Sequence, residues 1–384
     1  MDGDLIVKQK IDEANYKYQF VKNNKYWNYD KEYKLDIAGQ EYKINENDIL
    51  FGIANNIANN VSDVNDNRND MSNYLTVDVD PSKMKEIVTD FFVNINPKWQ
   101  EKIGFIFDHT DFIKYNDNIP SNEQRSVTNQ KGIKFYYKND LTSLVTLAHE
   151  VSHAIANLND NLEIKNGDKV EAFDEVESEM TEDMFLEYLK KSELSFVDSS
   201  SSSVRNLNDK DLDDIKYNKY KSALFLSYRA LDELGFKKFI NDNNIKGLNE
   251  DVINDLASSM NISKTDVLSR LDLFIDKYYP NDRLIHNYVG TNCYDLKNGE
   301  QLSNECRFIY AFCLVEKFNN MGFDYDKKCE FYKNYLDNVG NMSFQDTLNE
   351  FNVDLGNVNS FSSEFINKFN GLATDDKVVI QNTK

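Results

Sequence analysis

The spacing of hydrophobic and polar residues along the chain predicts a mainly helical protein. Several stretches beyond residue 80 have apolar positions three and four residues apart, which is the period of an amphipathic helix. The helices expected from this pattern cover residues 82–93, 141–158, 170–191, 209–234, 236–241, 250–279, 305–318, 325–338 and 343–351. Only four Pro and 14 Gly interrupt the 384 residues, so we predict a mainly α fold rather than an all-β one.

Two shorter stretches are typical of β-strands instead. Residues 102–109 (KIGFIFDH) form a compact apolar run, and residues 132–138 (GIKFYYK) alternate in character. A polar loop over residues 116–129 separates the two stretches. Asn139 and Asp140 then provide a cap for the next helix. We therefore expect a small β-sheet beside the helix that begins near residue 141.

That helix contains His149, Glu150 and His153 in an H-E-x-x-H motif. Residues four apart share one face of a helix, so the two imidazoles can bind one Zn²⁺ while Glu150 reaches a metal-bound water. The alternative is a core helix whose two histidines only form hydrogen bonds. The residues around the motif suit a buried helix: Leu141, Leu144, Val145, Ala148, Val151, Ser152 and Ile155.

The strand over residues 132–138 lies directly before this helix, which is the order of elements that a zinc peptidase needs. An edge strand beside the metal can pair with an extended peptide and hold it in place. Gly132, Ile133 and Phe135 are therefore candidate substrate-binding residues.

A catalytic zinc site needs a third protein ligand and leaves its fourth position to water. The only other histidines are His109 and His286, but the acidic helix over residues 170–191 offers carboxylates. Most of these acidic residues are expected to form a solvent-exposed face. One segment, EVESEMTE over residues 175–182, contains an E-x-x-S-x-x-x-E pattern.

The two motifs together resemble the thimet oligopeptidase/oligoendopeptidase F family of zinc metallopeptidases, which has a zincin-like helical fold. That family carries an H-E-x-x-H motif. After an intervening loop and about one helical turn, it carries a second motif, E-x-x-S-x-x-x-E. Its active helix reads TLAHELGHA where this chain reads TLAHEVSHA, with Ser152 in place of a Gly. The likeness covers roughly residues 100–370, and the family's large N-terminal helical part is shortened or replaced here.

The resemblance implies roles for residues of both motifs. Glu175 would be the third zinc ligand, Ser178 would fill the serine position, and Glu182 would brace the site from outside. Glu150 would act as the general base, taking a proton from the attacking water and returning it to the leaving amine. The resemblance thus implies a thermolysin-like mechanism.

The family also supplies a histidine and tyrosines from a C-terminal segment to the substrate and the oxyanion. His286 and Tyr288 match this segment best. Beyond them the pattern departs from that of the family, and Tyr294 and Tyr310 are alternative candidates for the tyrosine.

Charge and composition narrow the partners and the compartment. There are 44 Lys and Arg against 65 Asp and Glu, a net charge of −21 that repels nucleic acid and anionic membranes. No run of about 18 apolar residues and no signal-peptide-like start is present. The four Cys all lie in the last quarter of the chain and form no C-x-x-C pair; disulfides are one alternative, but we expect reduced thiols in a reducing compartment. We expect a cytoplasmic protein that acts on peptides; the sequence does not indicate an oligomeric state.

The leading hypothesis is a zinc-dependent endopeptidase that cleaves oligopeptides or unfolded segments. Residues 98–384 would form its catalytic domain, and residues 1–97 an N-terminal region packed on it. The resemblance implies an active site in a deep channel between helical walls, which excludes folded proteins. Because a shortened N-terminal half would leave that channel more open, a specialised protease acting on a protein target is one alternative. Another is a catalytically degenerate protein that binds zinc or peptide. A purely structural zinc site is less consistent with the motif, because such sites favour Cys.

Overall fold

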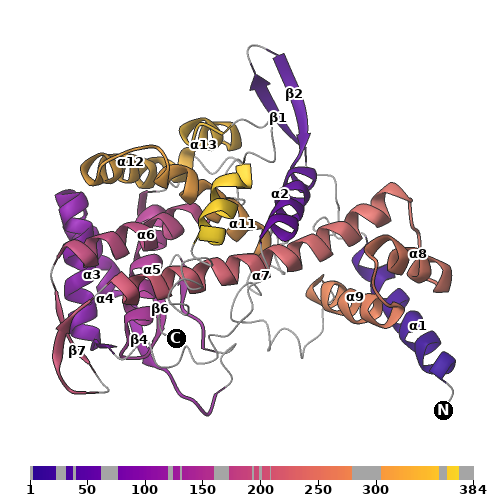
Figure 1. The fold of residues 1–384 in the computed structure, drawn as a ribbon, viewed down its shortest axis with the longest axis horizontal. Helices are drawn as coiled ribbons and strands as arrows, with labels where there is room; N and C mark the ends of the chain where they lie inside the picture. Colours follow the sequence, from indigo (N-terminus) through magenta and orange to yellow (C-terminus); the bar gives the residue numbers. More distant parts are fainter. Residues whose placement is uncertain are drawn as a thin grey trace, which may run out of the picture.

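The protein is mainly α-helical, as predicted (Figure 1). The computed structural model describes residues 3–22, 32–37, 40–61, 77–119, 124–129, 132–159, 173–192, 194–198, 201–207, 209–278, 304–353 and 361–371. Its longer helices are α1 (Gly3–Val21), α2 (Glu46–Asn60), α3 (Pro81–Ile95), α4 (Gln100–Asp108), α5 (Leu141–Asn159), α6 (Val176–Lys191), α7 (Asp209–Asp242), α8 (Glu250–Met260), α9 (Lys264–Tyr278), α11 (Asn304–Asn319), α12 (Tyr325–Asn338), α13 (Phe344–Glu350) and a helix over residues 361–371. Across the described residues, none of the helices combines the length and apolar character that crossing a bilayer demands.

Three small sheets accompany the helices. The hairpin of β1 (Glu32–Ile37) and β2 (Gln40–Asn45) projects beside α2 (Figure 1). A second sheet has the order β3-β7-β8, and the third, which matters for the site, has the order β4-β6-β5. The strands of the latter two sheets are β3 (Val77–Asp78), β7 (Ser195–Asp198), β8 (Val204–Asn206), β4 (Thr110–Lys114), β5 (Val127–Asn129) and β6 (Gly132–Tyr137).

The predicted sheet beside the motif helix is present, but its strand order differs from our expectation. β6 forms where residues 132–138 predicted a strand, yet it is the central strand, parallel to β4 and antiparallel to β5. The prediction of an edge strand there is wrong, because neighbours occupy both sides of β6. Ile133 and Phe135 are buried in the core. β5 is instead the edge strand that contacts α5.

The strand predicted over residues 102–109 is also wrong, because this stretch forms α4. A short 3₁₀ turn precedes it, and the Asn96 side chain caps that turn by accepting a hydrogen bond from the Lys98 N–H at 3.2 Å. Ile103 and Ile106 are buried on one face of α4, while Phe105 is exposed. A short apolar run is consistent with either a buried helix or a strand, so the pattern alone did not distinguish them.

The other predicted helices are present with three changes, while α1, α2 and the helix over residues 361–371 were not predicted. The acidic helix predicted from residue 170 begins only at Val176, because residues 173–175 are not α-helical. The break predicted at residue 235 is missing: α7 runs through Gly235 as one helix of 34 residues. The single helix predicted over residues 250–279 is divided into α8 and α9 by Asn261, whose φ of 54° gives α8 a left-handed C-cap. Asparagine tolerates this conformation better than most residues do.

The buried side chains form two hydrophobic clusters that share α7. The larger cluster contains side chains of helices α2 through α6, of the first part of α7 and of the helices after residue 304. The smaller cluster joins α1, α8 and α9 to the end of α7, through Phe236 and Ile240. α7 therefore crosses the molecule between the two helical groups (Figure 1). The division into domains near residue 97 stays a prediction.

Gly132 yields a test of the sheet. Its φ is +136°, and a Cβ at this position would lie 2.0 Å from the backbone carbonyl oxygen of His109. Gly132→Ala should therefore lower the free energy of unfolding by at least about 2 kcal/mol. The control is Gly104→Ala in α4, where a Cβ meets nothing within 4 Å, and which should stabilise by about 0.5–1 kcal/mol. Denaturant unfolding measures both, and equal midpoints for the two variants would contradict the arrangement of β4 and β6.

Candidate metal centre

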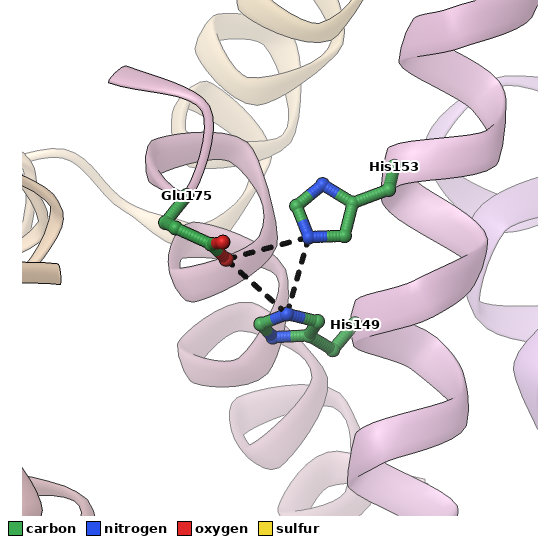
Figure 2. Close-up of side chains that lie close together, drawn as sticks. All are labelled: His149, His153 and Glu175. Carbon is green, nitrogen blue, oxygen red and sulfur yellow. Dashed lines mark hydrogen bonds and ion pairs between the residues drawn. The ribbon is translucent and has the colours of Figure 1, made fainter. Parts of the chain in front are cut away.

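Helix α5 presents two histidines to α6. At its start, the Asp140 side chain accepts a hydrogen bond from the Ser143 N–H at 2.7 Å. The Ser143 hydroxyl accepts one from the Lys138 N–H at 2.9 Å, which ties the end of β6 to the first turn of α5. His149 and His153 follow one turn apart, and their rings point toward the start of α6 (Figure 2). The residues of this helix that were predicted to be buried are buried, including Leu144, Ala148, Val151 and Ile155.

Three donor atoms converge at this point, two from α5 and one from the residue directly before α6 (Figure 2). The Nε2 atoms of His149 and His153 are 3.2 Å apart. Oε2 of Glu175 lies 3.5 Å from the first of these nitrogens and 3.4 Å from the second. Two ligands about 2.1 Å from a tetrahedral zinc ion lie about 3.4 Å from each other. The three atoms thus have the spacing of three corners of such a tetrahedron, and the group could hold a metal ion.

Glu175 occupies the position immediately before the first residue of α6. The Ser178 hydroxyl lies 3.0 Å from its carbonyl oxygen and 3.3 Å from its Oε2, so it can donate to either. Ser178 therefore lies beside Glu175, the residue that the resemblance assigned as third ligand. Ser152, at the position where the resembled family has a Gly, is buried and donates to the His149 carbonyl oxygen at 2.6 Å.

The second nitrogen of each imidazole contacts a carboxylate. Nδ1 of His149 lies 2.7 Å from Oε1 of Glu182, the residue expected to brace the site. Nδ1 of His153 lies 3.1 Å from Oε1 of Glu177. A carboxylate on Nδ1 orients the ring and holds the proton there, which leaves the lone pair of Nε2 for a metal. Both histidines therefore have the environment that metal-binding histidines usually have.

Glu177 is a member of the site that sequence reasoning missed. We assigned most acidic residues of this helix to a solvent-exposed face, and that assignment is wrong for Glu177, Glu179 and Asp183, which are buried. The physical reason is that α6 packs against α5, α7, α11 and α12. A signal was available: Met180 and Met184 lie three and seven residues after Glu177, on the same helical face.

The titration of the site follows from its crowded carboxylates. Burial alone would lower the pKa of both imidazoles, because it penalises their charged forms. Hydrogen bonds with the carboxylates outweigh burial, raising the pKa of His149 well above its usual value and that of His153 to about 10. Burial would raise the pKa of Glu175, but its bonds with the two imidazoles hold it well below its usual range. The carboxylates thus need positive charge between them, which either imidazole protons or a divalent cation can supply.

Glu150, between the two histidines, is held by the edge strand of the sheet. The Thr128 hydroxyl in β5 lies 2.5 Å from Oε2 of Glu150 and 3.0 Å from its backbone carbonyl oxygen, and can donate to either. The Glu150 residue is only 7% exposed. Sequence reasoning missed Thr128, because it lies in a segment predicted to be a loop.

A second layer of charge lies behind the site. Lys219 of α7 forms ion pairs with Glu179, Glu182 and Asp183. Burial alone would lower the pKa of Lys219, but these carboxylates raise it above its usual range. Burial alone would raise the pKa of Asp183, but the charge of Lys219 lowers this pKa to about 2. The pKa of Glu179, in contrast, is raised to about 7 by burial and by the charge of Glu182.

The C-terminal part of the predicted site is not tested by the described residues. His286, Tyr288 and Tyr294 lie outside the described residues, so their roles stay predictions. Tyr310 in α11 is fully buried, and its ring packs against Phe173, Phe344 and Phe361. His109 lies at the end of α4, exposed to solvent, where its Nδ1 is 2.8 Å from the Phe105 carbonyl oxygen.

Comparisons with known proteins add little to this geometry. No protein-family model matches the chain, and no curated protein matches it. Among solved structures, the chain is similar to a putative peptidase from Chlamydophila abortus, with 13% sequence identity and a TM-score of 0.43. The match covers 85% of this chain and 55% of that chain, so this chain spans about half the length of that protein.

Metal titration tests the centre directly. The purified protein should bind one divalent ion, and His153→Ala should weaken binding by more than about 100-fold, because it removes a donor atom. His109→Ala is the matched control, since this exposed histidine lies outside the group and should leave binding unchanged. Isothermal titration calorimetry and metal analysis after dialysis give affinity and stoichiometry. Equal affinities for the two variants would contradict the assignment.

Proposed function

We propose that the protein is a zinc-dependent peptidase that hydrolyses peptide bonds in extended oligopeptides or unfolded segments. The observation that carries the proposal is the convergence of Nε2 of His149, Nε2 of His153 and Oε2 of Glu175 within 3.5 Å of one another. The H-E-x-x-H motif adds a carboxylate, Glu150, between the two histidines.

Zinc is the ion that best fits this donor set. Two imidazoles and one carboxylate are a recurrent ligand set of catalytic zinc, and three protein ligands leave a position open. Sites of purely structural zinc favour Cys and close all four positions; no Cys belongs to the group within the described part of the chain. When bound, zinc supplies Lewis acidity, which polarises a carbonyl and activates water near neutral pH.

Glu150 is the proposed general base and acid. It takes a proton from the attacking water and returns it to the leaving amine. The bond from Thr128 to Oε2 supports this role, because it fixes the carboxylate while the second oxygen, Oε1, remains to accept the proton. The oxyanion roles of His286 and Tyr288 belong to the same proposal and rest on the resemblance alone.

The edge strand β5 is the proposed surface for the substrate backbone. Its partner in the sheet is β6, and within the described residues no strand pairs with its other side. An extended peptide added there would run beside α5, because β5 contacts that helix. This role replaces the one predicted for Gly132, Ile133 and Phe135, whose strand is central. An extended backbone is presented by short or unfolded peptides, which supports the proposed substrate class.

Glu150→Gln tests the chemistry. This variant should keep one zinc ion, because the ligands are untouched, but should lower the rate of peptide cleavage by at least about 100-fold, because proton transfer is lost. Glu187→Gln is the matched control in α6, outside the centre, and should cleave like the parent. The measurement is cleavage of quenched fluorescent peptides, with and without chelator. Unimpaired cleavage by Glu150→Gln contradicts the mechanism, and zinc binding without chelator-sensitive cleavage by the parent favours a non-catalytic binding protein.

Thr128→Val tests the support of the base. Valine has the shape of threonine and suits a strand, but it cannot donate to Glu150. We expect kcat to fall by about tenfold to a hundredfold, because the base is less well positioned, with zinc binding unchanged. Thr128→Ser keeps the hydroxyl and should retain most of the activity. Steady-state kinetics on the same peptides measure both variants, and equal kcat values for valine and serine would show that the hydroxyl does not matter.

A further inference from the structure

Lys219 of α7 brings a buried ammonium group to the outer side of the metal centre. Its side chain is 9% exposed. Nζ lies 2.5 Å from Oε2 of Glu179, 3.4 Å from Oδ1 of Asp183 and 3.5 Å from Oε2 of Glu182. It also donates a hydrogen bond to the Glu179 carbonyl oxygen at 3.0 Å. The lysine therefore joins α7 to three carboxylates on two neighbouring turns of α6.

Glu182 connects this lysine to the histidine ligand. Its Oε1 contacts Nδ1 of His149 at 2.7 Å, while its Oε2 faces Nζ of Lys219. The carboxylate thus has a partner at each oxygen: the imidazole at hydrogen-bond distance on one side and the ammonium in a 3.5 Å ion pair on the other. A carboxylate fixed in this way orients the imidazole more firmly than one that can rotate.

Lys219 also lies beside a second group of potential metal ligands. His149, Glu179 and Glu182 have donor atoms within 4.8 Å of one another, on the outer side of the first group. The Lys219 ammonium lies within 3.5 Å of a carboxylate oxygen of both glutamates. The Lys219 ammonium therefore supplies the positive charge for this second group. We expect the metal ion at the first group, which contains Glu175.

We propose that Lys219 is a positioning residue of the metal centre, which fixes the Glu182 carboxylate and, through it, the orientation of His149. The inference rests on the proposed metal centre and adds α7 to the elements that build it. Asp183 has a second partner in Asn319, whose Nδ2 donates to its Oδ2 at 2.7 Å. For Glu182, the only contacts that bear on its orientation within the described residues are Lys219 and His149.

Cobalt(II) is the probe, because its visible absorption reports coordination geometry as well as occupancy. Lys219→Met should bind Co²⁺ about 10- to 100-fold more weakly than the parent, as expected when an outer partner of a ligand is lost, and its absorption bands should change. Lys219→Arg keeps the positive charge and should restore most of the affinity. Lys219→Gln also removes the charge and should resemble Lys219→Met. The glutamine variant replaces the methionine variant in this test if the latter does not fold.

Lys237→Met is the matched control for a loss of buried charge. Lys237 lies on the same helix, is 7% exposed, and its Nζ is 2.7 Å from Oε1 of Glu233. This variant should lose stability in thermal unfolding, yet bind Co²⁺ with the affinity and spectrum of the parent. A general effect of destabilisation would instead weaken Co²⁺ binding in Lys219→Met and Lys237→Met alike, which would overturn the inference.

A double-mutant cycle with Glu182→Gln tests the route through that carboxylate. If Lys219 acts through Glu182, then Lys219→Met should change Co²⁺ affinity by less than about threefold once Glu182 is replaced. Additive losses would overturn the route. If the parent binds Co²⁺ and Lys219→Met binds it equally well with the same spectrum, the inference fails while the metal centre stands. If the parent binds no Co²⁺, both the metal centre and the inference are overturned.

Discussion

The need to balance buried negative charge is the constraint on which this structure depends. Where α5 packs against α6, carboxylates surround two imidazoles that are mostly removed from water. Buried charges are tolerated only when they are paired. Lys219 balances the outer carboxylates, and the inner group has the spacing of ligands around one small cation. The place where a metal ion could bind is thus defined by electrostatics as much as by the motif.

The packing of the helices and the sheet holds these groups in position. The β6–α5 junction fixes the start of the motif helix, and Thr128 of β5 fixes the residue between the two histidines. On the other side, α6 packs against α7, α11 and α12, and Glu177, Glu179 and Asp183 are buried there. A preorganised site of this kind keeps its charged groups in place without a cost at the moment of reaction.

The sequence predicted what depends on local spacing and missed what depends on tertiary packing. The mainly α fold, the motif helix and the strand before it were all readable from short-range patterns, and the two motifs identified the three residues that the fold brings together. The run at residues 102–109 was misassigned because a buried helix and a strand share the same apolar pattern. The position of β6 in its sheet and the contacts of Lys219 arise from packing between elements distant in sequence, so no local pattern revealed them. The burial of Glu177 also depends on this packing, and Met180 and Met184 on the same helical face were its only local signal.

X-ray absorption at the zinc edge tests the central claim most directly. The account predicts one zinc ion per chain in a four-coordinate shell of nitrogen and oxygen at about 2.0–2.1 Å, with the outer scattering of two imidazole rings. A shell with sulfur ligands at about 2.3 Å, or one without imidazole scattering, would contradict it, because the metal would then lie somewhere other than between His149, His153 and Glu175.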